Sequence, residues 1–282
     1  MTERILLCTD LDRTLLPNGD APESAQARTL FARLASHPNC TLAYVSGRYK
    51  ALVQEAIAEF NLPVPNFVIG DVGTSIYQVD AKDWQEWPQW AAEIAADWGG
   101  REQPDLQPLF SHLSALTLQE SSKQNRFKLS YYLSATADPE PLLSAMRECL
   151  TQESIRAELI YSVDESTATG LLDVLPASAT KYHAVEFLMQ QLGFGLDNTV
   201  FAGDSGNDLP VLTSPINSVL VANATDEVRR QALQLAREQA TEAALYLAAG
   251  GFMGMNGNYG AGILEGVAHY LPQTKQWMNS DD

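Results

Sequence analysis

The fold of this chain is decided near its start, by the stretch ILLCTDLDRT at residues 5–14. Its first residues are apolar and do not alternate with polar ones, a pattern typical of a strand buried on both faces of a sheet. The apolar run ends in Asp10 and Asp12, and ligand sites of open parallel sheets lie outside the carboxyl ends of their strands. The stretch therefore predicts a central parallel strand that presents two carboxylates to a functional site.

Short apolar runs of the same kind recur along the chain, at residues 41–45, 66–69, 199–202 and 219–221. Between them, apolar residues recur at helical spacing within 27–34, 185–192 and 228–235; the last of these segments follows Thr225, a residue type suited to cap a helix. Strands that alternate with helices predict a parallel sheet covered on both faces. We expect an α/β fold with a Rossmann-like core.

The middle of the chain has a different order of predicted elements, which is helix, strand, strand, helix, strand. Helices are expected at 84–98 and 141–150, and strands at 114–118, 128–133, 159–162 and 171–175. This predicts an inserted α+β cap domain at residues 81–176 within a discontinuous catalytic core of residues 1–80 and 177–282. Six glycines at 250–262 predict a loop before a last helix near 261–270, and so many glycines leave a mobile loop open as an alternative to a fixed one.

Four of the five tryptophans lie between Trp84 and Trp98, where aromatic side chains could stack on a sugar. Most of the apolar residues in this segment fall on one helical stripe, which predicts a helix face packed on the sheet of the cap. Trp90 lies off the stripe, which leaves it as the better candidate for stacking.

The composition limits the classes of partner. The net charge is −17, from 18 basic and 35 acidic residues, and such a surface repels nucleic acid and anionic lipid. The three cysteines, Cys8, Cys40 and Cys149, show no spacing of a disulfide framework or zinc site. No segment approaches the roughly 20 apolar residues of a membrane span. We expect a reduced cytoplasmic protein that binds neither nucleic acid nor membrane.

Two carboxylates as close as Asp10 and Asp12 repel each other unless a cation or a difference in protonation separates them. We expect Asp10 to stay ionised on a divalent ion and act as nucleophile, and Asp12 to be partly protonated and act as acid. The pattern D-x-D-x-T, completed by Thr14, is weak by itself, because a turn with capping aspartates would look the same.

A second acidic loop, GDSGND at residues 203–208, strengthens the signal because it also follows a predicted strand. Carboxylate oxygens from two strand ends would form the hard ligand set that Mg²⁺ prefers. Asp204 is the expected metal ligand, with Asn207 and Asp208 steadying the site. A calcium loop is the alternative, but the spacing of an EF-hand is absent.

Two basic elements complete the expected site. Ser46, Gly47 and Arg48 follow a strand, and a hydroxyl with free backbone N–H groups at such a turn forms an anion nest. Lys181 begins a predicted helix, where its ammonium could bridge a phosphate and Asp10. A lysine at a helix start is usually a surface residue, but its place between the cap and the acidic loop favours the site.

The order of these motifs resembles that of the haloacid dehalogenase superfamily of phosphatases, in the subclass with a large α/β cap. Four further segments are similar to the sucrose-6-phosphate phosphatases of cyanobacteria and plants: GDVGTSIY at 70–77, RFKLSY at 126–131, LDVLP at 172–176 and YGAGILEG at 259–266. The resemblance covers nearly the whole chain. Tyr49 departs from the family, which often has serine there, and this could alter the sugar pocket.

The resemblance implies a phosphoaspartyl intermediate on Asp10, with Asp12 as acid and then base. It further implies Mg²⁺ held by Asp10, the backbone carbonyl of Asp12, and Asp204. Residues that would contact the substrate are Ser46, Gly47, Arg48, Lys181 and Asn207 around the phosphate, and Lys128 at a sugar hydroxyl. A glycosyltransferase of the sucrose-phosphate synthase type is the implied candidate partner.

The implied substrate is sucrose 6-phosphate, and mannosylfructose phosphate and glucosylglycerol phosphate are the nearest alternatives. Two other classes stay open. A sugar phosphotransferase or mutase would use every one of these catalytic residues, although such mutases usually carry a smaller helical cap. A non-catalytic partner of a glycosyltransferase would have no use for carboxylates kept so close together.

Overall fold

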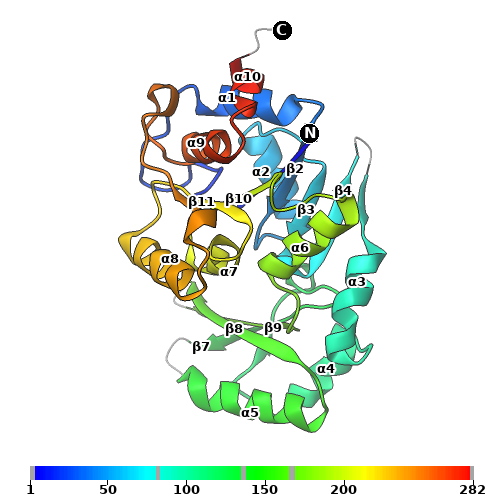
Figure 1. The fold of residues 1–282 in the computed structure, drawn as a ribbon. Helices are drawn as coiled ribbons and strands as arrows, with labels where there is room; N and C mark the ends of the chain where they lie inside the picture. Colours follow the sequence, from blue (N-terminus) through cyan, green and yellow to red (C-terminus); the bar gives the residue numbers. More distant parts are fainter. Residues whose placement is uncertain (1–3, 81–82, 135–137, 165–168, 280–282) are drawn as a thin grey trace. The chain divides into compact units, whose positions relative to one another are not determined.

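The computed structural model describes residues 4–80, 83–134, 138–164 and 169–279 (Figure 1). The chain forms two compact units, which we call the core unit (Met1–Glu86 with Lys181–Asp282) and the cap unit (Trp87–Thr180). The expected cap began at residue 81, which lies outside the described residues. Its expected end at residue 176 falls four residues before the end of the compact unit at Thr180.

The core unit contains an eight-stranded sheet of order β12-β11-β10-β1-β2-β3-β4-β5. The strands from β12 to β3 are parallel, and β4 and β5 are antiparallel additions at one edge. Their bounds are Ile5–Thr9 (β1), Cys40–Val45 (β2), Phe67–Gly70 (β3), Ser75–Val79 (β4), Trp84–Glu86 (β5), Thr199–Gly203 (β10), Asn217–Leu220 (β11) and Leu245–Leu247 (β12). The α/β fold with a parallel-dominated sheet is confirmed.

Helices cover both faces of this sheet, which explains why its strands are apolar without alternation. Ile5 and Leu7 point into a cluster with residues of α1, α2, α9 and α10, whereas Leu6 and Cys8 are buried on the other face. Figure 1 shows α1 and α9 on one side of the strands and α6 and α7 on the other. The helices are α1 (Ala27–Ser36), α2 (Lys50–Glu59), α6 (Lys181–Leu192), α7 (Leu209–Leu212), α8 (Asp226–Glu238), α9 (Gly260–Tyr270) and α10 (Thr274–Asn279).

The glycine-rich segment before α9 is tied to the region that precedes α1. Asn256 and Asn258 both donate hydrogen bonds to the carbonyl of Pro22, and Gln26 donates to the carbonyl of Met253. Three side-chain hydrogen bonds therefore anchor this loop to the segment that leads into α1.

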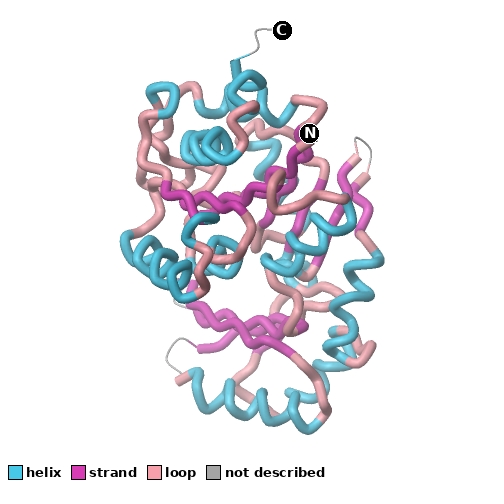
Figure 2. The backbone as a smooth tube through the Cα atoms, viewed as in Figure 1, coloured by secondary structure: helices cyan, strands magenta, loops and turns pink. Residues whose placement is uncertain are grey.

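The cap unit is an antiparallel sheet of order β6-β7-β9-β8 with helices α3, α4 and α5 (Figure 2). Its elements are β6 (Thr117–Leu118), β7 (Leu129–Ser134), β8 (Ala157–Asp164), β9 (Thr169–Pro176), α3 (Pro88–Ala95), α4 (Gln103–Leu106) and α5 (Pro139–Gln152). The strand expected at 114–118 is confined to Thr117–Leu118. No described helix of either unit is both long and apolar enough to cross a membrane.

The single helix expected at 84–98 is wrong. Trp84 belongs to strand β5 of the core unit, where it pairs with Val79, and the helix begins only at Pro88. Proline is favoured in the first turn of a helix and disfavoured in its interior, and this signal outweighs the apolar spacing. Trp90 is 1% exposed, so it is a core residue of the cap unit and not available for stacking on a sugar.

Candidate active site

The site lies where parallel strands of the core unit end. Asp10 follows β1, Ser46 follows β2 and Asp204 follows β10. Thr9 is in register with Tyr44 on one neighbour and with Ala202 on the other, so the three strands end at nearly the same level. Parallel pairing therefore brings together residues that are 36 to 194 positions apart in the sequence.

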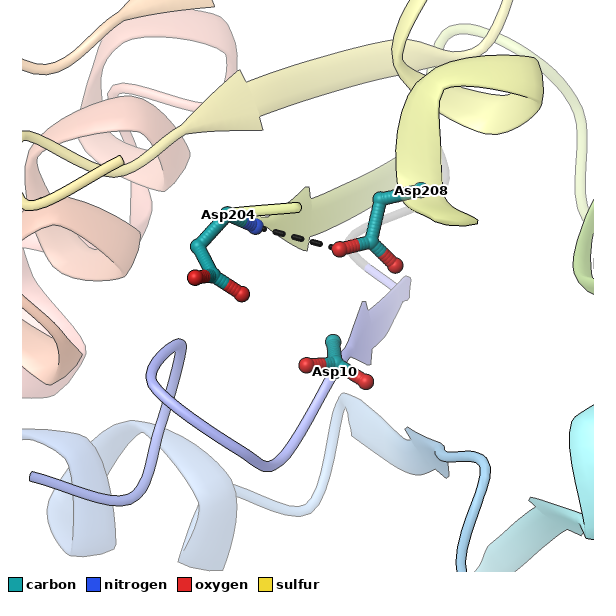
Figure 3. Close-up of side chains that lie close together, drawn as sticks. All are labelled: Asp10, Asp204 and Asp208. Atoms are coloured by element: carbon teal, nitrogen blue, oxygen red, sulfur yellow. Dashed lines mark hydrogen bonds between the residues drawn. The ribbon is translucent and has the colours of Figure 1, made fainter. Parts of the chain in front are cut away.

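Three buried carboxylates converge at this edge (Figure 3). One oxygen from each of Asp10, Asp204 and Asp208 lies within 4.8 Å of the others, and all three residues are buried. Thr14 donates a hydrogen bond of 3.1 Å to Oδ1 of Asp204. The expectation that two acidic loops at separate strand ends meet is therefore realised in the geometry.

Asp208 is held in place by its own loop. Its Oδ2 accepts hydrogen bonds from the backbone N–H groups of Asp204 and Ser205, both at 3.1 Å, and lies 3.0 Å from the Ser205 hydroxyl. A Cβ on Gly203 would lie 2.6 Å from Cγ of Asp208, so only glycine fits there. Both oxygens of Asp208 are engaged, since Oδ1 faces Lys181.

Lys181 joins the two acidic loops. Its ammonium lies 2.8 Å from Oδ1 of Asp10 and 2.7 Å from Oδ1 of Asp208, and 3.4 Å from the side-chain oxygen of Asn207. The lysine is 4% exposed. Burial alone would lower the pKa of Lys181, but the two carboxylates outweigh it and raise the pKa, so the side chain stays charged.

The positive charge at this site does not balance the negative charge. Three buried carboxylates face one buried ammonium and Arg13, whose Nε is 3.6 Å from Oδ2 of Asp204 but whose side chain is 51% exposed. Burial raises the pKa of Asp10 to about 7 and that of Asp204 to about 6. Burial first, and the charge of Asp208 in addition, disfavour the ionised form of both groups, and a bound divalent cation would offset this.

The donor set fits a hard divalent ion such as Mg²⁺. Within the described part of the chain, the cluster that could hold a metal ion consists of carboxylates. Asp10, Asp204 and the backbone carbonyl of Asp12 are the groups that would hold it. Among the described residues, none donates a hydrogen bond to Oδ2 of Asp10 or to the carbonyl oxygen of Asp12. These two oxygens are therefore free to serve as ligands or, for Asp10, as a nucleophile.

The turn after β2, where an anion nest is expected, follows the strand that pairs with β1. Ser46 is buried, and its hydroxyl accepts a hydrogen bond of 3.1 Å from the N–H of Arg48. The N–H of Gly47 has no acceptor within the described part of the chain, and a Cβ on Gly47 would meet no atom within 4 Å. A free N–H group beside open space is what an anion nest requires.

The protonation expected for Asp12 is wrong in this arrangement. Arg48 donates two hydrogen bonds to the Asp12 carboxylate, from Nε at 2.8 Å and from Nη2 at 2.6 Å. Burial would raise the pKa of Asp12, but the bonds from Arg48 outweigh burial and lower it. The raised pKa belongs to Asp10 instead. Arg48, which was expected to contact the phosphate, is paired with the candidate acid Asp12 in this arrangement.

Removing Arg48 should therefore weaken the fold in a pH-dependent way. The pair is partly exposed, so Arg48→Ala should lower the free energy of unfolding by about 0.5–1 kcal/mol at neutral pH. A depressed pKa stabilises the fold above the unfolded value of about 4, and this contribution is lost as the pH falls through the folded value. Urea titrations of both proteins should converge once the pH is low enough to protonate Asp12 in the folded state. A difference that persists there would assign Arg48 a packing role.

Three residues near the site were not singled out from the sequence. Arg13 has φ 59°, a left-handed conformation that is costly for any residue but glycine, and Asn18 and Asn223 both bind its backbone. No motif or spacing marks these asparagines, because their contacts arise only after folding.

Lys128, which was singled out from the sequence, belongs to the cap unit, where its Nζ lies 3.8 Å from Asp173.

Comparison with known proteins names the family. The sequence profile of sucrose-6F-phosphate phosphohydrolases matches residues 3–271. The chain belongs to this family. Sucrose-6F-phosphate phosphohydrolases are part of the haloacid dehalogenase superfamily, and the membership makes this chain a phosphoric monoester hydrolase of the sugar-phosphate phosphatase type.

Individual relatives agree with the family assignment. A Nitrosococcus oceani protein described as a haloacid dehalogenase-like hydrolase is 52% identical, over 99% of this chain and 75% of that protein. The mannosylfructose-phosphate phosphatase of Agrobacterium fabrum is 30% identical, over 79% of this chain and 85% of that protein. Among solved structures, the sucrose-phosphatase of Synechocystis sp. PCC6803, in complex with sucrose and phosphate, aligns with TM-score 0.67 and 26% identity, over 95% of this chain and 98% of that one.

Proposed function

We propose that this chain is a Mg²⁺-dependent phosphatase that hydrolyses a phosphorylated disaccharide, with sucrose 6-phosphate as the first candidate. The observation that carries the proposal is the buried cluster of Asp10, Lys181, Asp204 and Asp208 at the carboxyl ends of parallel strands. Carboxylates kept this close, with too little positive charge between them, destabilise a fold unless they bind a cation. When bound, Mg²⁺ would neutralise charge on the phosphoryl oxygens.

The reaction would proceed in two steps. An oxygen of Asp10 attacks phosphorus, and the bond from phosphorus to the sugar oxygen breaks as that oxygen takes a proton from Asp12. Water then attacks the phosphoaspartate, returns a proton to Asp12 and releases phosphate, which restores Asp10. Lys181 and the N–H of Gly47 hold the phosphoryl oxygens throughout.

Arg48 adds a condition to the first step. Asp12 must carry a proton when the sugar oxygen departs, and the ion pair with Arg48 lowers the pKa of Asp12. The pair therefore has to open before Asp12 can act as an acid. Arg48 is then free to contact the phosphate, the role that the sequence suggested for it.

The choice of sugar rests on the family and on the relatives. The profile describes sucrose-6F-phosphate phosphohydrolases, and the similar solved structure holds sucrose and phosphate. The Agrobacterium relative acts on mannosylfructose phosphate, which makes that disaccharide phosphate the main competitor. Phosphate release across a panel of disaccharide, glycosylglycerol and monosaccharide phosphates, with Mg²⁺ and with EDTA, tests the proposal. Equal turnover of monosaccharide phosphates would defeat the disaccharide assignment, and full activity in EDTA would defeat the metal.

Within the cap unit, Lys128 is the candidate for a sugar hydroxyl contact. Along β7, Leu129, Tyr131 and Leu133 are buried, and Phe110 meets Tyr131 edge-on at 6.2 Å between ring centroids. The opposite face is mixed, with Ser130 and Asp173 in register with Ile160. Ser130 donates a hydrogen bond of 2.5 Å to Asp173, whose second oxygen faces the ammonium of Lys128. Polar side chains joined in this way suit a polyhydroxylated ligand.

Lys128→Met should separate sugar recognition from chemistry. We expect kcat/KM for the preferred sugar phosphate to fall about 10- to 100-fold, because a site built to bind a hydroxyl loses its partner. Activity on p-nitrophenyl phosphate, which has no sugar, should stay within about threefold of the unmodified protein. Arg147→Ala, an exposed cation on α5, is the control. Equal losses on both substrates would remove Lys128 from sugar recognition.

A glycosyltransferase that makes the sugar phosphate is the proposed partner. In support, a glucosylglycerol-phosphate synthase of Pseudomonas anguilliseptica is 31% identical over 77% of this chain, which matches only 26% of that protein. A match to one part of a synthase is what a fused phosphatase segment would give. Co-purification with a candidate synthase at physiological salt would test the association.

A further inference from the structure

The backbone of residues 10–13 has one carbonyl oxygen without a donor. The carbonyl of Asp10 accepts from the Thr9 hydroxyl, that of Leu11 accepts three backbone N–H groups, and that of Arg13 accepts from Asn223. Among the described residues, none donates to the carbonyl of Asp12. A single unpaired acceptor beside Asp10 needs a partner from outside the chain, since polar groups near a buried site are otherwise satisfied.

Asn18 determines where that carbonyl oxygen points. Its Oδ1 accepts a hydrogen bond of 2.8 Å from the N–H of Arg13, which belongs to the same peptide unit as the carbonyl of Asp12. Because a trans peptide is planar, its N–H and C=O point in opposite directions, and fixing one fixes the other. The Nδ2 of Asn18 also donates a bond of 2.7 Å to Oδ1 of Asp12. Asn18 therefore holds both the peptide and the carboxylate of Asp12.

Asn223 fixes the other side of Arg13. Its Nδ2 donates a hydrogen bond of 2.6 Å to the carbonyl of Arg13, and its Oδ1 accepts from the N–H of Tyr259 at 2.8 Å. Tyr259 is fully buried at the start of α9, so Asn223 is tied to the core of the molecule. Arg13 has φ 59°, and a strained conformation of this kind persists only where its surroundings enforce it.

We propose that Asn18 and Asn223 are positioning residues for the divalent-ion site. Asn18 holds the peptide between Asp12 and Arg13 and Asn223 holds the next one, so that the Asp12 carbonyl binds the ion. The inference rests on the proposed function, because it assigns the ligand geometry of that site. Asn18 accepts from the N–H of Arg13 and Asn223 donates to its carbonyl, so together they fix the two successive peptides that flank this residue. They also keep the Arg13 guanidinium near Asp204, 3.6 Å from its Oδ2.

Isothermal titration of Mg²⁺ into the ion-free protein tests this directly. Asn18→Ala and Asn223→Ala should each raise the Mg²⁺ dissociation constant about 10- to 100-fold, the usual cost of losing a group that orients a metal ligand. The double variant should lose less than the product of the single losses, because both asparagines fix the conformation of the same residue, Arg13. Excess Mg²⁺ should restore kcat in Asn223→Ala, with KM unchanged, because this side chain does not bind the Asp12 carboxylate.

Asn217→Ala is the matched control, since it removes one side-chain bond to the Leu196 carbonyl at the opposite end of the sheet. Its Mg²⁺ affinity should equal that of the unmodified chain. Equal affinities in all variants would overturn the inference and leave the phosphatase intact. Absence of Mg²⁺ binding by the unmodified chain would overturn the proposed cofactor and the inference together. If one alanine variant unfolds, the other still decides, because it acts from the other side of Arg13.

Discussion

Asp10→Asn should abolish phosphate release, lowering kcat by at least about 10⁴-fold, as loss of a nucleophile does in other enzymes. Asparagine has nearly the same shape, so the fold should remain. In EDTA the variant should be the more stable protein above neutral pH, because its residue 10 carries no charge that must be buried. Activity assays with a sugar phosphate and thermal melts in EDTA provide both measurements.

The sign of the stability difference follows from the pKa of Asp10, which burial raises to about 7 in the folded protein. Between the unfolded value of about 4 and this folded value, the native state holds more protons than the unfolded state. The unmodified protein therefore loses stability relative to Asp10→Asn as the pH rises from about 4 to about 7. Asp197→Asn, an exposed change in the loop before β10, should show neither effect. Appreciable activity in Asp10→Asn would rule out Asp10 as the nucleophile.

Lys181→Met should damage both the fold and the reaction. The ammonium is buried between Asp10 and Asp208, and its removal leaves buried carboxylates without a counter-charge. Breaking a buried ion pair from one side typically costs about 3–5 kcal/mol in the free energy of unfolding. Urea titrations in EDTA at about pH 8 should show a loss of this size, and phosphate release should fall with it.

Acid and Mg²⁺ should each reduce the damage in Lys181→Met. Without the ammonium, the pKa values of the carboxylates rise further, so protonation relieves their repulsion as the pH is lowered. Mg²⁺ that binds only the folded state stabilises it by mass action. Lys275→Met, an exposed lysine on α10, is the control and should stay within about 0.5 kcal/mol of the unmodified protein. A Lys181→Met protein of normal stability in EDTA would contradict the buried charge cluster.

The sequence predicts the parts of the molecule that depend on local pattern and strand order. The apolar run before Asp10 indicates a strand buried on both faces, and parallel pairing then brings its end to the end of β10. Asp204 follows from the same rule. The prediction that Lys181 belongs to the site is weak from residue type alone, and its position between the cap and the acidic loop is the useful signal. In each case the periodicity or strand order that gave the prediction also determines the structure.

The remaining parts depend on contacts that no local pattern records. Trp84 and Trp98 have helical spacing, yet Trp84 pairs with Val79 in a strand, because pairing with β4 outweighs local periodicity. The protonation of Asp12 could not be predicted because it depends on which way the Arg48 guanidinium turns. Asn18 and Asn223 were missed for a related reason, since their partners are backbone groups whose direction the sequence does not show.

The most direct test of the account is to find which residue carries the phosphoryl group during turnover. Rapid acid quench of the enzyme mixed with labelled substrate and Mg²⁺, followed by peptide mapping with mass spectrometry, would show this. The account predicts label on the peptide that contains Asp10, and none in Asp10→Asn. Label on any other residue, or none at any time point while phosphate is released at the full rate, would contradict it.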